Sequence, residues 1–180
     1  AVVAAFTVVA ASLKADIDET TERAFAADLV IASGGFDVVG LSPELAGEIA
    51  ELPEVETATG LGRAPVRMHG EDRLVSTADG PSLDGVMELD VRDGSIADVV
   101  EGTLAVSEGY ADENGLAVGD AVPVTFSDGE SEELSVAAVY DADDVVGTAL
   151  LSESTWAAHA VQQNDTTVAI RLADGVSLDD

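Results

Sequence analysis

The segment Leu104-Ala-Val-Ser-Glu-Gly-Tyr-Ala-Asp-Glu-Asn-Gly-Leu-Ala-Val-Gly-Asp120 carries most of the information about the fold. Its apolar start predicts a strand over Leu104–Ser107. Ser107 is a good N-cap for a short helix over Ser107–Asn114, and Gly115 suits the left-handed residue that ends such a helix. Val118-Gly119-Asp120 predicts a turn into a strand over Ala121–Phe126. We therefore expect a strand, a capped helix and a further strand in close succession.

Upstream, the sequence predicts a strand, a helix and a second strand. Asp28–Ser33 is expected to be a buried strand that Gly34-Gly35 ends. Ser42-Pro43 suits the start of a helix and Pro53 its end, with Leu45, Ile49 and Leu52 on the inner face. Val55–Gly60 is the second strand. A unit of this length favours βαβ geometry.

The middle of the chain is predicted to be β-rich. Ala64–His69 and Arg73–Thr77 flank a hairpin turn at 69–72. Residues 79–102 are rich in Asp and Gly, and we expect loops there, with short strands around Met87–Val91. A strand over Glu133–Tyr140 is expected to pair with the strand that precedes it.

The last part repeats the strand–helix–strand form. Ala149–Leu151 and Thr166–Leu172 are the predicted strands, and Ser154–Val161 is the helix between them. The simplest architecture that accommodates these predicted elements is α+β with two lobes. One lobe comprises 27–78 and 134–180, from both parts of the chain, and the other is a β-rich insert over 79–133.

The first thirteen residues carry no charge and precede Lys14. As a helix they would be about 20 Å long, against about 30 Å for a bilayer core. The end of a transmembrane helix, a buried helix of a soluble domain and a processed remnant all fit. The first is favoured, because an apolar i, i+4 stripe continues into the polar residues without Gly or Pro. We expect 1–26 to be a membrane-helix end and a stalk, and both ends to continue in a longer protein.

Composition excludes several classes of function. The chain has 7 Lys+Arg and 36 Asp+Glu, a net charge of −29, yet 47% of its residues are hydrophobic. Such a chain folds, but it lacks the basic face that nucleic acid or anionic lipid requires. It has no cysteine, so disulfides and thiolate sites are excluded.

No catalytic, cofactor or metal site is predicted. The sequence has no Walker loop and no Gly-x-Ser-x-Gly, and Gly60-Leu-Gly62 is interpreted as a strand end. Its two histidines, His69 and His159, are 90 positions apart and are expected to be a surface residue and a partly packed one. Trp156 is expected to anchor the core. Several acidic clusters, including Asp128, Glu130, Glu132 and Glu133, show no EF-hand spacing.

Three of the seven basic residues are close together: Arg63, Arg67 and Arg73. Arg67 and Arg73 are expected to face the same way across the hairpin. One interpretation is that the three neutralise nearby acids. The other is that they contact an acidic partner or lobe, which makes them the candidate partner-contact residues.

Four segments together resemble the extracytoplasmic (periplasmic core) domain of MacB/FtsX-like ABC transporter permeases. They are Ala27–Ile31, Leu41–Val55, Leu104–Asp120 and Leu134–Tyr140, in the order and spacing typical of the family. The resemblance implies a porter-like lobe with an inserted β-rich lobe, on the extracytoplasmic face of the cell membrane. It implies a permease dimer, a membrane domain and a separate cytoplasmic ATP-binding subunit as partners. It implies no catalytic residues and no cofactor here.

Two functions follow as alternatives. As a permease domain, the chain would pass motion driven by ATP hydrolysis to an exported cargo or an extracellular partner, neither of which the sequence identifies. The alternative is a free-standing acidic secreted domain for binding or adhesion. A hydrolase is a minor third, because it would need a desolvated carboxylate or histidine in a cleft.

Overall fold

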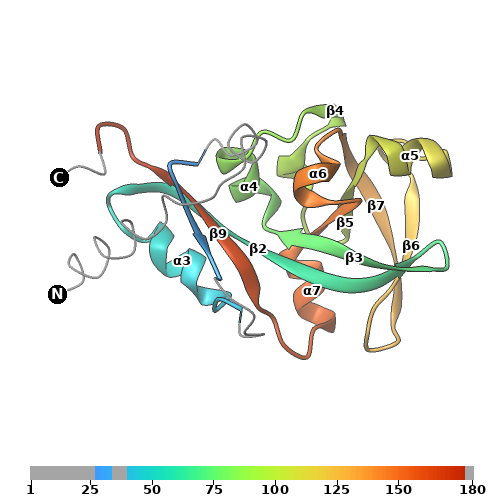
Figure 1. Ribbon diagram of the computed structural model, residues 1–180. Coiled ribbons are helices and arrows are strands. Elements are labelled where there is room, and N and C mark those ends of the chain that lie inside the picture. Colours follow the sequence, from blue (N-terminus) through green and yellow to red (C-terminus); the bar gives the residue numbers. More distant parts are fainter. Residues whose placement is uncertain (1–26, 34–39, 177–180) are drawn as a thin grey trace.

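The computed structural model describes residues 27–33 and 40–176 (Figure 1). The predictions for residues 1–26, for Gly34-Gly35 and for 177–180 fall outside these residues. The strands are β1 (Leu29–Ala32), β2 (Val55–Met68), β3 (Glu71–Ala78), β4 (Val91–Gly94), β5 (Thr103–Ser107), β6 (Ala121–Thr125), β7 (Ser131–Tyr140), β8 (Ala149–Ser152) and β9 (Asp165–Leu172). The helices are α3 (Glu44–Ala50), α4 (Gly80–Val86), α5 (Glu108–Asn114), α6 (Asp143–Val146) and α7 (Glu153–His159), with a 3₁₀ turn, η1 (Ile96–Asp98).

β2 is one uninterrupted strand of 14 residues. The prediction of two strands separated around Gly60-Leu-Gly62 is therefore wrong. At about 3.3 Å per residue the strand is about 46 Å long. Its first half pairs with β9 and its second half with β3, both antiparallel. β2 is thus shared by two differently packed parts of the fold.

The second half of β2 belongs to a closed ring of strands. β6 pairs with β7 and also with the end of β2, which closes the order β2-β3-β8-β5-β7-β6. Apolar side chains fill the interior. Those from the strands include Val66, Val75, Val106, Val122, Val136 and Leu151. Closure satisfies the hydrogen bonding of strands that would otherwise be edges.

The first half of β2 lies in an open sheet of order β1-β9-β2. β1 and β2 are parallel, because each is antiparallel to β9, and α3 packs on them through Ala46 and Ile49. The predicted strand–helix–strand unit is confirmed, with β9 inserted between its strands. β1 is only half-buried, contrary to prediction, since among the described residues it pairs with β9 alone. β1 begins and β9 ends at the same end of this sheet (Figure 1).

Helix α4 is a third correction, because 79–102 was expected to contain loops and short strands. An oxygen of Asp79 accepts a hydrogen bond from the backbone N–H of Ser82 at 3.0 Å, and Pro81 occupies the first turn. Leu83 and Val86 are fully buried against η1, Tyr140 and neighbouring strands. The capping signal was present in the sequence, but the acidic, glycine-rich context obscured it.

The short helix after β5 agrees with its prediction. Ser107 accepts a hydrogen bond from the N–H of Tyr110 at 3.3 Å, and Gly115 ends α5 with a φ of 64°. Ser152 caps α7 in the same way through Thr155. Trp156 is buried in the interior of the ring, which confirms it as a core anchor.

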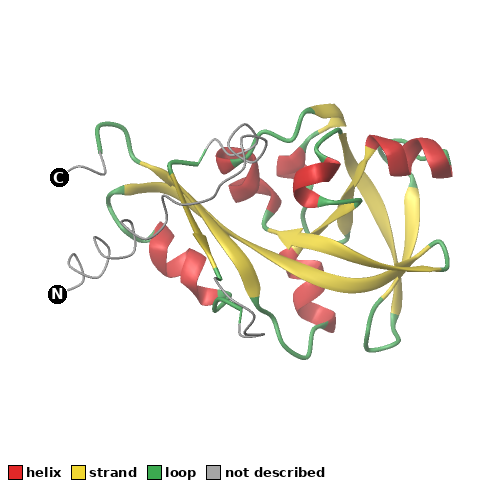
Figure 2. Cartoon of the chain, viewed as in Figure 1, coloured by secondary structure: helices red, strands yellow, loops and turns green. Residues whose placement is uncertain are grey.

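The fold class α+β is confirmed, with helices on both sides of a mixed sheet (Figure 2). The division into lobes at residues 79 and 133 stays a prediction.

Close packing of α4 on η1 gives a stability test. In Gly80→Ala the new methyl group would meet the carbonyl oxygens of Ile96 and Val99, which are backbone atoms and cannot move away. We expect the free energy of unfolding to fall by about 1–3 kcal/mol. Gly109→Ala, in the first turn of α5 with open space around it, should be neutral or stabilise by up to about 1 kcal/mol. Urea unfolding followed by circular dichroism measures both, and equal midpoints would contradict this packing.

Candidate functional site

The three arginines proposed as a contact patch lie on two different faces. In the β2–β3 hairpin, Arg67 is opposite Asp72, and Arg73 is opposite Val66, whose side chain points into the ring. Residues opposite each other share a face. Arg67 and Arg63 therefore point outward and Arg73 points to the inner side, so the expectation that Arg67 and Arg73 face the same way is wrong.

Two of the arginines are already paired with carboxylates. Arg67 lies 2.7 Å from Asp72, and this contact raises the pKa of the guanidinium and lowers that of the carboxyl. Arg73 lies 2.6 Å from Glu71 and also covers the ring of Tyr110, 4.9 Å from its centroid. The first pair is exposed to solvent, so it contributes little stability.

The outer face of the hairpin also carries an exposed apolar side chain. Leu74 is 60% exposed and lies opposite Pro65, on the face that Arg63 and Arg67 share. Arginine beside exposed apolar surface is a composition typical of protein interfaces. We call Arg63, Pro65, Arg67 and Leu74 the hairpin face.

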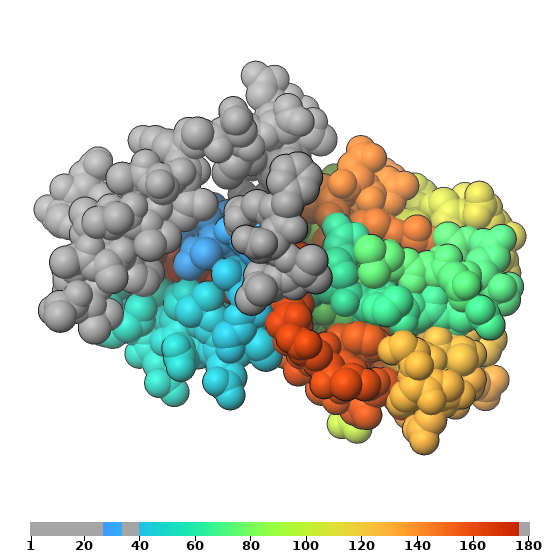
Figure 3. Space-filling view, turned by 60° about the horizontal axis from the view of Figure 1, so that its bottom comes forward, coloured from blue at the N-terminus to red at the C-terminus, as the bar shows by residue number. Residues whose placement is uncertain are grey.

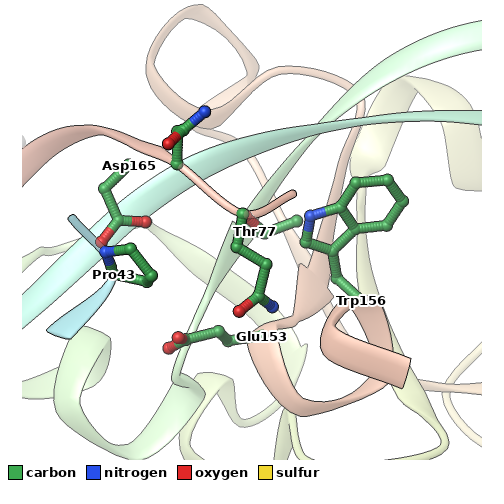
Figure 4. A pocket seen from close by; sticks show the side chains of 7 residues that line it. Pro43, Thr77, Glu153, Trp156 and Asp165 are labelled. Carbon is green, nitrogen blue, oxygen red and sulfur yellow. The ribbon is translucent and has the colours of Figure 1, made fainter. Parts of the chain in front are cut away.

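A small depression lies at the start of β9, between that strand and α7. It is lined by Asp165 and Glu153, with Pro43, Thr77 and Trp156 around them (Figure 4). Its volume is about 10 Å³, room for one water molecule and not for a substrate. Asp165 packs against the backbone of β2 at Gly60, where a Cβ would collide with its carboxylate. The sequence feature that reflects this contact is therefore Gly60-x-Gly62.

Asp165 is only 7% exposed. Burial, with a further contribution from the charge of Glu153, raises the pKa of Asp165 from 3.8 to about 6. Burial and Asp79 raise the pKa of Glu153 as well. Two carboxyl groups with raised pKa values are candidates for acid–base chemistry, but this depression leaves no space for a reactant.

The second histidine is more deeply placed than expected. His159, at the end of α7, is 5% exposed, and its Nδ1 lies 2.8 Å from Asp128 in the turn between β6 and β7. Burial lowers the pKa of His159, but Asp128 and Glu132 outweigh burial and raise it above its ordinary value. His69 is exposed, as expected, and its Nδ1 lies 2.6 Å from the hydroxyl of Tyr110.

Comparisons with known proteins identify the fold. No family model matches the sequence, and no curated protein matches it. The periplasmic region of MacB from Actinobacillus actinomycetemcomitans is similar, with a TM-score of 0.58 and 13% identity over 82% of this chain and 75% of that one. The extracellular domain of the noncanonic ABC-type transporter YknZ from Gram-positive bacteria has a TM-score of 0.56 and 12% identity, over 81% and 83%.

A domain assigned to a permease protein from Porphyromonas gingivalis has a TM-score of 0.55 and 20% identity, over 90% of this chain and 80% of that one. The chain thus has the fold of extracytoplasmic domains of ABC transporter permeases, and the resemblance seen in the sequence is confirmed at the level of the fold. Among the described helices, none is both long and apolar enough to cross a bilayer.

The raised pKa of Asp165 predicts a pH dependence of stability. Its folded-state pKa exceeds its ordinary value of 3.8, so its contribution is complete below about pH 3.8 and is lost as the pH rises through about 6. At pH 7, Asp165→Asn should therefore raise the free energy of unfolding by on the order of 1–2 kcal/mol, a figure reduced for residual solvation. Near pH 4 it should have little effect.

The matched control is Asp112→Asn, which removes the same charge from an exposed position on α5. Thermal unfolding of both variants at pH 4 and pH 7 makes the comparison. An equal gain in both variants at pH 7 would show that only the overall charge matters.

Proposed function

We propose that this chain is the extracytoplasmic domain of an ABC transporter permease subunit. In this role it couples ATP hydrolysis by a cytoplasmic subunit to export, or to an extracellular partner, by mechanical transmission. The observation that carries the proposal is the fold shared with the periplasmic region of MacB, the extracellular domain of YknZ and a domain of a permease protein, each aligned over at least 81% of this chain. The order of motifs from Ala27 to Tyr140 supports the same function independently.

The proposed role is one of binding and transmission rather than catalysis. The depression at Asp165 is too small for a substrate, and the ATPase would be a separate subunit or domain. The partners are the membrane domain of the permease, the ATP-binding subunit and a second permease protomer. The location is the extracytoplasmic face of the cell membrane.

The hairpin face is our proposed contact with an acidic partner. On a chain of net charge −29, Arg63 supplies positive charge, and Arg67 would exchange its contact with Asp72, on the same face, for a carboxylate of the partner. Leu74 supplies apolar area between the two arginines. Arg73 is on the other side of the hairpin and is not part of this face. The attraction acts at short range, where acidic side chains of the partner meet the two arginines, because at longer distances the net charge of −29 repels an acidic partner.

The proposed location can be tested by cysteine labelling in the full-length protein. The chain has no cysteine, and Val161 is fully exposed, so Val161→Cys adds one accessible thiol. We expect a membrane-impermeant maleimide to label it in intact cells. The unsubstituted full-length protein gives the background, and Ala105→Cys, at a fully buried position, should react only after denaturation.

Labelling of Val161→Cys only after the membrane is opened would contradict the location. Recovery of the labelled protein from the medium, with none in the membrane fraction, would favour the free-standing secreted domain instead.

The contact role can be tested in the assembled transporter. The full-length permease and its ATP-binding subunit are reconstituted in liposomes, and ATP hydrolysis is measured. Arg63→Ala with Arg67→Ala should reduce the activity about fivefold or more, as expected when interface arginines are removed. Arg92→Ala is the control, because Arg92 is equally exposed and also ion-paired, with Asp141, but lies on β4. Equal activity in both variants would exclude the hairpin face as a functional contact.

A further inference from the structure

His159 lies in an unusual setting for a histidine. Its side chain is 3% exposed, and its ring stacks on Phe126 with centroids 3.8 Å apart and planes 6° apart. The stacking fixes the orientation of the ring, so both nitrogens point in set directions. Figure 3 shows the last residues of α7 beside the turn that joins β6 and β7.

Three carboxylates surround this ring. From Nδ1, the nearest oxygen of Asp128 is 2.8 Å away and that of Glu130 is 3.9 Å away. From Nε2, the nearest oxygen of Glu132 is 3.3 Å away. Among the residues that the structure describes, Asp128, Glu130 and His159 form the group whose potential metal-ligand atoms all lie within 4.8 Å of one another.

The other ring nitrogen, Nε2 of His159, also has unusual surroundings. It is shielded from solvent and has no hydrogen-bond partner, because the oxygen of Glu132 is near but outside hydrogen-bond geometry. A buried nitrogen without a partner is costly, and such groups are rare in folded proteins. A histidine that binds a metal through one nitrogen usually donates its other N–H to a carboxylate. Glu132 stands where that carboxylate would be.

We propose that His159, Asp128 and Glu130 form a binding site for a divalent first-row transition metal ion such as Zn²⁺. Nδ1 of His159 and one oxygen from each carboxylate are the ligands, and the ion takes the place of the proton between His159 and Asp128. With the ion bound, a small movement of the half-exposed Glu132 side chain, now 3.3 Å from Nε2, would let it accept the Nε2–H and orient the ring. An imidazole among carboxylates selects such ions over Mg²⁺ and Ca²⁺, which prefer oxygen ligands alone.

The bound ion would tie the turn between β6 and β7 to α7. Asp128 and Glu130 are exposed enough to adjust their positions, with side chains 29% and 76% exposed, whereas His159 is fixed by its stacking. The site is independent of the permease function proposed above, so either can fail without the other.

The test is a titration of the 180-residue chain with Zn²⁺ in excess Mg²⁺, which occupies the diffuse acidic surface. Two histidines give separate imidazole signals in ¹H–¹⁵N NMR spectra, so His69 is an internal control. We expect one saturable ion per chain, a shift of Nδ1 of His159 and no change at His69. Calorimetry under the same conditions gives the affinity.

Variants identify the ligands and the orienting carboxylate. His159→Gln should abolish saturable binding, and Glu132→Gln should weaken it about tenfold or more. Glu133→Gln removes the same charge one residue further along β7, on the outer side of the strand, and should leave the affinity unchanged. If His159→Gln does not fold, the difference in Zn²⁺ affinity between Glu132→Gln and Glu133→Gln still tests the proposed site.

Three results would overturn the proposal. They are Zn²⁺ binding of equal strength in the two glutamate variants, a shift of His69 in place of His159, and displacement of Zn²⁺ by Mg²⁺. Each would mean that the acidic surface holds the ion without a built site.

Discussion

The unbroken hydrogen bonding along β2 is the constraint on which the rest of the structure depends. This strand belongs at once to the open sheet with β9 and β1 and to the closed ring of six strands. The change of partner occurs around Gly62, where the register with β9 shifts. A side chain there would contact the hydroxyl of Thr77 at 2.6 Å and the backbone of Asn164 at 3.0 Å. The absence of a side chain therefore lets three segments approach at the point where the two parts of the fold join.

Features that depend on neighbouring residues, such as helix caps, could be predicted from the sequence. Features that depend on pairing between distant strands could not. The cap at Ser107 and the left-handed Gly115 follow from residues within one turn of helix, so α5 could be predicted almost residue by residue. Ring closure depends on Arg67 pairing with Thr125, which no local pattern contains. Glycine usually weakens a strand, so Gly60-x-Gly62 was interpreted as the end of a strand. In the structure these glycines instead leave room for the side chain of Asp165 within a continuous strand. The fold class was accessible, but the path of its longest strand was not.

The candidate sites show the same limit. The hairpin around His69 was predicted, but its loop has only two residues, His69 and Gly70, both with positive φ. That loop length sets the pairing of Arg67 with Asp72, and one residue more would have reversed the face of every following side chain. His159 and Asp128 are brought together across 31 positions by the docking of α7 on the β6–β7 turn. The sequence around His159 contains no pattern that indicates such a contact.

The neighbouring positions of the start of β1 and the end of β9 make the fold respond differently to different directions of force. Ladder hydrogen bonds are perpendicular to their strands. A pull on both ends in one direction acts along the strands and loads the bonds between β9 and β2 in shear, so that they share the load and must break together. A pull that separates the ends would instead unzip β1 from β9 one bond at a time. The sheet therefore resists a force that pulls both ends in the same direction, and it yields more easily to a force that pulls the ends apart.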